Sequence, residues 1–171
     1  MTRKEEKYKE FEQMLSRSHS ILIKICLAFT DRQYDNVLDL YQEIVCNLWQ
    51  GWHDFRGESN FTTWLYRIAL NTAAMDYRKR KKRKNYIAID STVVKNLVEE
   101  AEDPRKDKFY HLINQLSADE KEIIMLFLDR LTYAQIADIC GTTEAAAKQK
   151  IYRIKQKLKQ LHLRNDDELY G

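Results

Sequence analysis

The sequence predicts an all-α protein in which two small helical domains, residues 8–84 and 108–163, are joined by a linker. Four glycines and one proline in 171 residues are too few for a turn-rich β protein. Apolar residues recur instead every three or four positions, which is the spacing of one face of an amphipathic helix. A stretch without that period, residues 85–107, separates the two periodic regions.

Three amphipathic helices are expected in the first domain. The second of them ends near Gly51, where the polar pair His53–Asp54 follows. The third begins at Phe61 and continues into a run of basic residues, 78–84. One apolar face on each helix would let the three pack around a common core. These faces consist of Phe11, Leu15, Ser18, Leu22, Ile25 and Phe29; Val37, Tyr41, Ile44, Val45, Leu48 and Trp52; and Phe61, Trp64, Leu65, Ile68, Ala69 and Thr72.

The segment 85–107 is predicted to be a linker, with a short helical piece near Val93 to Val98. Its composition differs from that of the flanking regions, because it carries the only proline of the chain and a cluster of acidic residues. Proline and clustered like charges are typical of connecting segments. The residues concerned are Glu99, Glu100, Glu102, Asp103 and Pro104.

The second domain has the order of elements of a helix-turn-helix. Ser117 and Glu120 form a capping box at the start of one helix, and Thr132–Gln135 repeats that signature for a short helix. A glycine turn at Gly141 follows, and then a basic helix from about Thr143 to Leu161. Two helices joined by a glycine turn also occur in proteins that do not bind DNA, so this pattern alone leaves the function open.

Charge is segregated along the chain, although the net charge is only +3. Residues 78–84 are all basic, and the stretch from Lys148 to Arg164 contains basic residues and no acidic one. Acidic residues gather on one face of the second helix, at Asp35, Asp39 and Glu43. Such segregation predicts separate surfaces for partners of opposite charge, nucleic acid among them.

No pattern in the chain points to catalysis or to a cofactor. Cys26, Cys46 and Cys140 are few, odd in number and far apart, without the paired spacing of metal or redox sites. The four histidines are scattered, and neither a phosphate-binding glycine loop nor a nucleophile motif occurs. We therefore expect a protein that is not an enzyme and that holds no metal.

The sequence predicts a cytoplasmic protein that does not insert into a membrane. The highly charged N-terminus does not have the form of a signal peptide. The most apolar run, Ile21 to Phe29, is interrupted by Lys24 and is too short to span a bilayer.

The stretch from Phe55 to Asn71 carries the most specific signal for function. A polar loop around Gly57 leads into an aromatic-rich helix, and that helix ends in the basic run. Polar loops and aromatic rings suit unstacked bases, and clustered Arg and Lys suit phosphates. The amide of Asn71 could recognise a base edge or could bond the backbone of its own helix. Phe55 precedes the helix and has little reason to be buried.

This stretch resembles the promoter-melting segment of the extracytoplasmic-function (ECF) sigma factors, which belong to the sigma-70-like subunits of bacterial RNA polymerase. The loop, the tryptophan and the terminal asparagine match in order and spacing, and the resemblance extends over roughly residues 8–161. It implies that the loop and Asn71 hold a base flipped from the −10 element, beside basic contacts to DNA. The implied −10 contacts are Phe55, Arg56, Gly57, Glu58, Ser59, Asn60, Asn71, Arg78, Arg80 and Lys81.

The resemblance also implies a docking face for core RNA polymerase on the second helix. The motif Asp39–Glu43 stands at the family's distance before the loop. In sigma factors this face meets the clamp helices of the polymerase, whereas on most helices such residues would be ordinary solvent-facing surface. The implied docking residues are Asp35, Asp39, Gln42 and Glu43.

The basic helix of the second domain departs from the family where it should contact the −35 element. Sigma factors typically have Gly-Thr-Val-Lys-Ser-Arg-Leu at the position of Ala145–Ile151 in this chain. The resemblance therefore implies binding to −35 DNA and leaves the preferred base sequence open. The implied −35 contacts are Thr143, Lys148, Gln149, Tyr152, Arg153 and Lys155.

A sigma factor is the function that this resemblance implies, with core polymerase, a duplex −35 element, a single-stranded −10 element and an anti-sigma factor as partners. The acidic linker would then lie in the RNA exit channel. An autonomous DNA-binding regulator could use the same helix-turn-helix, but it would not explain the Phe55 loop or the acidic face. A nucleic-acid-modifying enzyme is a third alternative, because paired carboxylates occur on many acidic helices.

Overall fold

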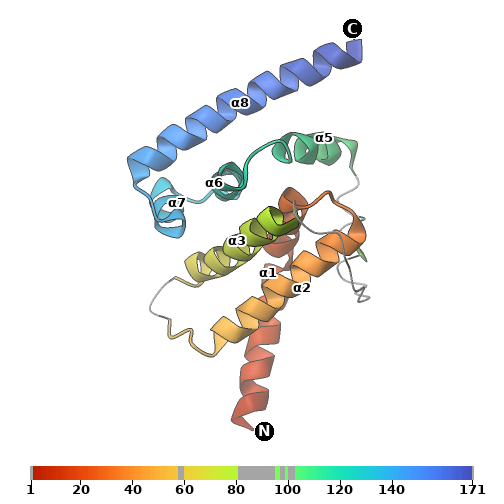
Figure 1. Ribbon diagram of the computed structural model, residues 1–171. Helices are drawn as coiled ribbons and strands as arrows, with labels where there is room; N and C mark the ends of the chain where they lie inside the picture. Colours follow the sequence, from red (N-terminus) through yellow and green to blue (C-terminus); the bar gives the residue numbers. More distant parts are fainter. Residues whose placement is uncertain (1, 58–59, 81–94, 97–98, 100–102, 171) are drawn as a thin grey trace. The chain divides into compact units, whose positions relative to one another are not determined.

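The computed structural model (Figure 1) describes residues 2–57, 60–80, 95–96, 99 and 103–170 of the chain. Every regular element in this part of the protein with assigned bounds is an α-helix, which confirms the predicted fold class. The chain divides into two compact units, Met1–Glu100 and Ala101–Gly171. Each unit is described by itself below.

Three mutually packed helices form the first unit: α1 (Arg3–Phe29), α2 (Tyr34–Trp52) and α3 (Phe61–Arg80). Their predicted apolar faces meet in the interior, as expected for helices that each carry one apolar stripe. Ser18 is the polar member of the stripe on α1, and its hydroxyl donates a hydrogen bond to the Met14 carbonyl at 2.9 Å. The largest fully buried side chains are Leu22, Ile25, Phe29, Leu38, Leu40, Ile44, Leu48 and Leu65.

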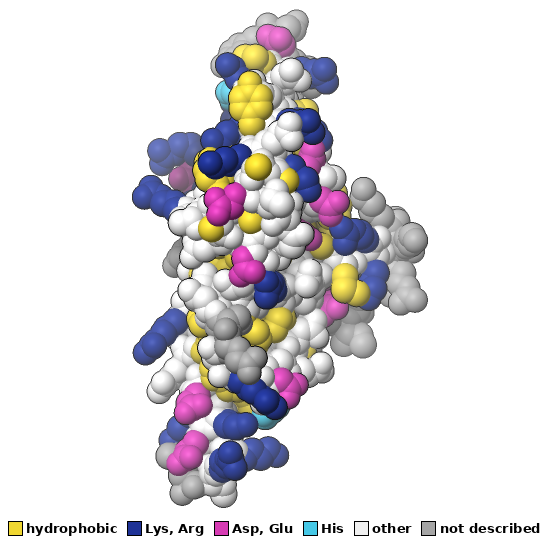
Figure 2. Space-filling model, turned by 90° about the vertical axis from the view of Figure 1, so that its left-hand side faces the viewer, with side chains coloured by type: hydrophobic (Ala, Val, Ile, Leu, Met, Phe, Trp, Pro, Cys, Tyr) yellow, Lys and Arg dark blue, Asp and Glu magenta, His cyan; other side chains and the backbone are white. Residues whose placement is uncertain are grey.

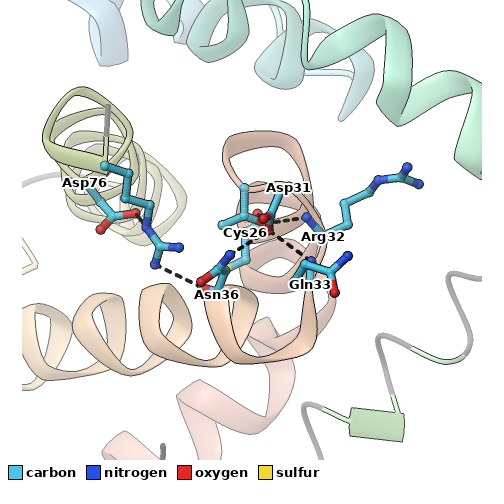
Figure 3. Close-up of polar contacts among 8 residues, drawn as sticks. Cys26, Asp31, Arg32, Gln33, Asn36 and Asp76 are labelled. Carbon is cyan, nitrogen blue, oxygen red and sulfur yellow. Dashed lines mark hydrogen bonds and ion pairs between the residues drawn. The ribbon is translucent and has the colours of Figure 1, made fainter. Parts of the chain in front are cut away.

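A tight turn joins α1 to α2. Arg32 has a positive φ of 64°, a conformation that is uncommon outside glycine. One carboxylate oxygen of Asp31 accepts hydrogen bonds from the Gln33 backbone N–H at 3.1 Å and from Asn36 Nδ2 at 2.7 Å (Figure 3). Asp31 therefore satisfies a backbone donor at the start of α2, where the N-cap residue itself makes no side-chain capping bond.

Four helices form the second unit: α5 (Pro104–Ile113), α6 (Ala118–Leu128), α7 (Tyr133–Cys140) and α8 (Glu144–Tyr170). Helix α8 packs on α5, α6 and α7, and it buries Ala147, Ile151 and Ile154. A lysine is also buried in this unit. The ammonium group of Lys121 donates to Asn114 Oδ1 at 3.0 Å, which ties α6 to the residue that ends α5.

Local capping signals set the start of α6 and both ends of α7 as the sequence predicted. Ser117 and Glu120 form a reciprocal capping box at the start of α6, and Thr132 and Gln135 form one at the start of α7. Gly141 ends α7 in the left-handed conformation, with φ 63° and ψ 40°. The unit therefore contains the predicted succession of short helix, glycine turn and basic helix.

Two boundaries differ from the prediction. Helix α5 begins at Pro104, inside the segment predicted as a linker, because the Asp103 carboxylate caps it through the Arg105 N–H at 2.9 Å and proline suits the first helical position. Helix α8 extends to Tyr170 rather than ending near Leu161.

Long-range and local ion pairs support the extra turns of α8. Asp166 pairs with Lys108 of α5 at 2.9 Å and lies 3.3 Å from the His162 imidazole. Lys108 and Asp166 are far apart in the sequence, so a local sequence pattern cannot predict the contact between them. Residues 81–84 of the basic run, and most of the helical piece expected near Val93 to Val98, lie outside the described residues, although Lys95 and Asn96 are helical.

Replacing Gly141 by alanine should destabilise the second unit, because a Cβ atom is strained at its positive φ. Apart from its chain neighbours, no atom lies within 4 Å of the position that this Cβ would occupy, so backbone conformation sets the effect. We expect Gly141→Ala to lower the free energy of unfolding by about 1–2 kcal/mol, and Gly141→Asn to lower it by less. Urea unfolding followed by circular dichroism measures both. Equal stability of all three proteins would contradict the strain argument.

Candidate nucleic-acid interface

An aromatic cluster anchors the loop that precedes α3. The Phe55 ring stacks on Trp52, with centroids 6.0 Å apart and planes inclined by 16°, and lies 4.9 Å from the Trp64 ring. Phe61 completes the cluster at 6.2 Å from Phe55. Phe55 is thus half-buried, contrary to the expectation that it had little reason to be buried. Aromatic rings contributed by two helices supply that reason, because stacking removes apolar area from water.

The loop itself projects from this anchor. Arg56 and Gly57 are exposed, and Gly57 has a φ of 73°. Asn60 is exposed as well, and its side-chain oxygen accepts the backbone N–H of Thr62 at 3.0 Å at the start of α3. Glu58 and Ser59, which the sequence also placed among the −10 contacts, lie outside the described residues. The structure therefore provides exposed residues held at the base of the loop by half-buried rings.

Asn71 occupies the exposed face of α3 and remains available to a partner. Among the described residues its amide makes no hydrogen bond, so the alternative in which it bonds its own helix is not observed. The neighbouring Thr72 behaves differently. Its hydroxyl donates to the Ile68 carbonyl at 2.7 Å and accepts from Asn47 Nδ2 at 2.9 Å. Helical spacing places exposed Arg67 one turn before Asn71 on the same face.

The predicted docking residues lie on α2, beside the last turn of α3. Asp35 and Glu43 are exposed, whereas Asp39 and Gln42 are half-buried. Burial raises the pKa of Asp39 above its usual value, and the charge of Arg80 acts in the opposite direction.

Residues of α3 also affect the pKa of Glu43. Burial raises its pKa and Asp76 adds to the rise, while Lys79 and Arg80 oppose it. The acidic face of α2 therefore lies within electrostatic reach of the last turn of α3.

The side chain of Arg80 lies against α2. Its Nε lies 2.6 Å from Asp76 Oδ2, and its Nη2 donates to the Asn36 carbonyl at 3.1 Å. Figure 3 shows Asp76 on α3 opposite Asn36 on α2. By contrast, the side chains of Arg78 and Lys79 are exposed. The spacing of Asp76 and Arg80, four positions apart on one helix, is the sequence signal that could have indicated this pair.

The helix-turn-helix presents exposed polar and aromatic side chains on α8. Gln149, Tyr152 and Arg153 are exposed, and 64% of the Tyr152 surface is accessible. The Thr143 hydroxyl accepts the Ala146 N–H at 3.1 Å and so caps the start of α8.

Several lysines of α8 are held by neighbouring side chains. The Lys148 ammonium lies 5.1 Å from the centre of the Tyr133 ring, and the Lys155 ammonium lies 4.1 Å from the centre of the Phe127 ring. Attraction between a cation and an aromatic face restrains both lysines beside α6 and α7. Lys157 pairs with Glu120 at 2.8 Å. Only part of the basic charge of this helix therefore faces outward without such a restraint.

On the face in Figure 2, Lys and Arg side chains are interspersed with Asp, Glu and apolar ones. No helix in the described part of the chain is both long and apolar enough to cross a membrane. Within the same residues, no group of three or more His, Cys, Asp or Glu side chains is placed to hold a metal ion.

Two family matches identify the chain. Residues 14–83 match Sigma-70 region 2, and residues 106–158 match Sigma-70, region 4. The first match covers the helices that carry the aromatic loop, and the second covers the helix-turn-helix. The chain therefore belongs to the sigma-70 family of RNA polymerase sigma factors. It is of the extracytoplasmic-function type, and promoter recognition follows from its two regions.

Individual relatives agree with this assignment. RNA polymerase sigma factor SigV of Bacillus subtilis is 29% identical over 138 residues, which cover 80% of this chain and 81% of that protein. The ECF RNA polymerase sigma-E factor of Haemophilus influenzae is 27% identical over 172 residues, covering 86% and 85%. The ECF sigma factor EcfG of Rhodopseudomonas palustris is 27% identical over 141 residues, covering 80% and 77%.

Solved structures share the fold. Sigma factor RpoE, solved in complex with the anti-sigma factor NepR from Bartonella quintana, matches with a TM-score of 0.65 and 25% identity over 90% of this chain and 96% of that one. CnrH, solved in complex with the cytosolic domain of CnrY, matches with a TM-score of 0.63 and 20% identity over 90% and 88%.

Arg153→Ala should weaken use of the −35 element, because Arg153 is exposed on the outward face of α8. A specific base contact is worth about 1–3 kcal/mol, so promoter binding should fall while binding to a scrambled −35 sequence stays the same. Lys157→Ala is the matched control, since it removes one positive charge that is already paired with Glu120. Binding of polymerase loaded with each variant to both DNAs provides the measurement. Equal losses on both sequences would make Arg153 a backbone contact.

Proposed function

We propose that this sigma factor works in three parts: α2 docks on core RNA polymerase, the Phe55 loop and α3 melt and trap the −10 element, and α8 contacts the −35 element as duplex. The observation that carries the proposal is the placement of regions 2 and 4 on two separate compact units. The two halves of a promoter can then be contacted by different parts of one chain.

The melting role rests on the loop and the exposed face of α3. Arg56, Gly57 and Asn60 project beyond the aromatic anchor, and Asn71 offers an amide that is not used elsewhere among the described residues. An extruded base needs a hydrogen-bond partner for its edge and an apolar surface for its ring. The Asn71 amide is a group of the first type, and the aromatic rings of the anchor are groups of the second. Phe55 acts mainly through the anchor, which fixes the loop. Arg78 supplies positive charge for the phosphates of the strand, and we assign the same role to Lys81. To Glu58 and Ser59 we assign contacts with bases.

The docking role rests on the charge of α2. Asp35, Asp39, Gln42 and Glu43 lie on one helix face, and three of them are acidic. A basic partner surface would gain from this arrangement, and charge complementarity of this kind also directs the encounter of two proteins.

The −35 role rests on the outward face of α8. Gln149, Tyr152 and Arg153 are placed for base or backbone contacts, and Lys148 and Lys155 flank them at restrained positions. Thr143 acts through the cap that starts the helix. Because helix N-termini carry partial positive charge, this end can also approach a phosphate.

Domain bounds of 8–84 and 108–163, with a linker between them in the RNA exit channel, complete the proposal. An anti-sigma factor that covers these surfaces is a further expected partner, since the related RpoE was solved with one. We place the protein in the cytoplasm, where the polymerase is, and assign it no catalytic activity of its own.

Run-off transcription with purified core polymerase and fragmented genomic DNA tests the function. A sigma factor should produce discrete transcripts that depend on both core polymerase and this chain. An autonomous regulator would produce none without another sigma factor, and an enzyme would alter the template. Tight, sequence-specific binding of duplex promoter by the isolated chain would favour the regulator.

Reversing the charge of the docking face should prevent assembly. The double variant Asp39→Lys, Glu43→Lys should no longer co-purify with core polymerase, because like charges would meet at the interface. Glu6→Lys, Glu10→Lys is the matched control, since it changes the charge equally at exposed positions of α1. Circular dichroism checks that helicity is retained in both variants. Normal co-purification of the first variant would show that the docking face lies elsewhere.

Asn71→Ala should impair promoter opening in a way that removal of a phosphate contact does not. We expect fewer open complexes on duplex DNA and an altered base preference at one −10 position, because the amide no longer meets the extruded base. Permanganate footprinting reports opening, and a pre-melted −10 bubble should restore it without restoring the base preference.

Arg78→Gln is the control for that experiment. It should weaken binding to all DNA sequences alike. It should also flatten the dependence of log affinity on log salt by about 0.7–0.9 for each phosphate that is no longer neutralised. If Asn71→Ala changes neither the footprint nor the base preference, Asn71 has no role in base capture.

A further inference from the structure

Arg80, a member of the basic run, bridges two helices. Its guanidinium contacts the Asp76 carboxylate of its own helix at 2.6 Å and the Asn36 carbonyl of α2 at 3.1 Å. Only 21% of the Arg80 side chain and 13% of the Asp76 side chain are exposed. A phosphate contact would require this guanidinium to leave both partners and turn outward.

The surroundings of Arg80 are acidic. The positive charge of Arg80 acts to lower the pKa of three carboxyl groups. These are Asp39 and Glu43, both assigned to the docking face, and Asp76. Burial raises the pKa of Asp76, and the charge and hydrogen bond of Arg80 oppose that rise. The guanidinium is therefore a half-buried counter-charge to a group of carboxylates that two helices contribute.

We propose that Arg80 is a positioning residue, which holds the last turn of α3 on α2 beside the polymerase-docking residues, and that it is not a DNA contact. This inference rests on the proposed function and removes Arg80 from the −10 contacts that the resemblance implies. Arg78 and Lys79, which precede Arg80 on the same turn, are exposed. Fixing that turn aims their charges, and it links the helix that melts DNA to the helix that docks.

The geometry explains why arginine rather than lysine is needed. A guanidinium is a planar fork that can donate from Nε to one acceptor and from Nη2 to another, whereas a lysine ammonium is a single point of charge on a flexible stem. Lysine at position 80 would keep the positive charge but could not reproduce both contacts in this arrangement. A phosphate contact, by contrast, would tolerate lysine.

The same substitution at two arginines of the first unit separates the two roles. Full-length Arg80→Lys and Arg17→Lys are each assembled with core polymerase, and open-complex formation is measured on a duplex promoter across a salt series. We expect Arg80→Lys to reduce opening by about tenfold, comparable to loss of one charge-assisted hydrogen bond. Arg17→Lys, at an exposed position of α1 outside the proposed binding surfaces, should be close to wild type. The slope of log affinity against log salt should stay unchanged for Arg80→Lys and also for Arg80→Gln.

Asp76→Asn tests the bridge from its other end. It should reproduce the opening defect, and the double variant Asp76→Asn, Arg80→Lys should be no worse than either single variant, because both remove one shared interaction. The same cycle in thermal unfolding of the free chain measures the coupling between the two residues without polymerase.

The outcomes distinguish this inference from the proposed function. If wild-type chain with core polymerase gives no discrete transcripts, the proposed function fails, while the unfolding cycle still decides whether Arg80 and Asp76 are coupled. Normal opening by Arg80→Lys together with a flattened salt slope for Arg80→Gln would identify Arg80 as a phosphate contact and overturn the inference. Strict additivity in the unfolding cycle would overturn it as well.

Discussion

Burial of one face of α3 against α1 and α2 determines which of its side chains can meet a partner. Leu65 and Ala69 lie in the core, so the period of the helix turns Arg67 and Asn71 outward. Thr72 adds a polar contact to α2 that fixes the rotation of α3 about its own axis. The proposed capture of a base depends on this packing, because a helix rotated by one position would bury the Asn71 amide.

Positive charge in this protein has two uses, and position along a helix does not separate them. Arg80 and Lys157 neutralise carboxylates of their own unit, whereas Lys79 and Arg153 are exposed. A charge held by an internal partner contributes to the shape of the surface rather than to its affinity for phosphate. The number of basic residues on α3 and α8 therefore overstates the number of DNA contacts, and the salt dependence of binding should be smaller than that number suggests.

Much of the fold could be predicted because the relevant interactions are local. The capping box at Ser117, the turn at Gly141 and the apolar period of α1 each depend on residues within a few positions of one another. The start of α5 at Pro104 also depends on neighbouring residues. The prediction of a linker treated proline as a helix breaker and did not include Asp103 as the N-cap. The end of α8 was not local, because its stabilising contact joins Asp166 to Lys108 of another helix.

The candidate site divides in the same way. Sequence alone determined the family, the fold class and the identity of the exposed loop, because the order and spacing of Phe55, Trp64 and Asn71 do not depend on how the helices pack. Only the tertiary structure decided that Phe55 is anchored by rings from two helices and that Arg80 bridges α3 to α2. A side chain of either type could face a partner or the interior. The choice depends on which acceptors and rings the neighbouring helix places within reach, and that is a property of packing.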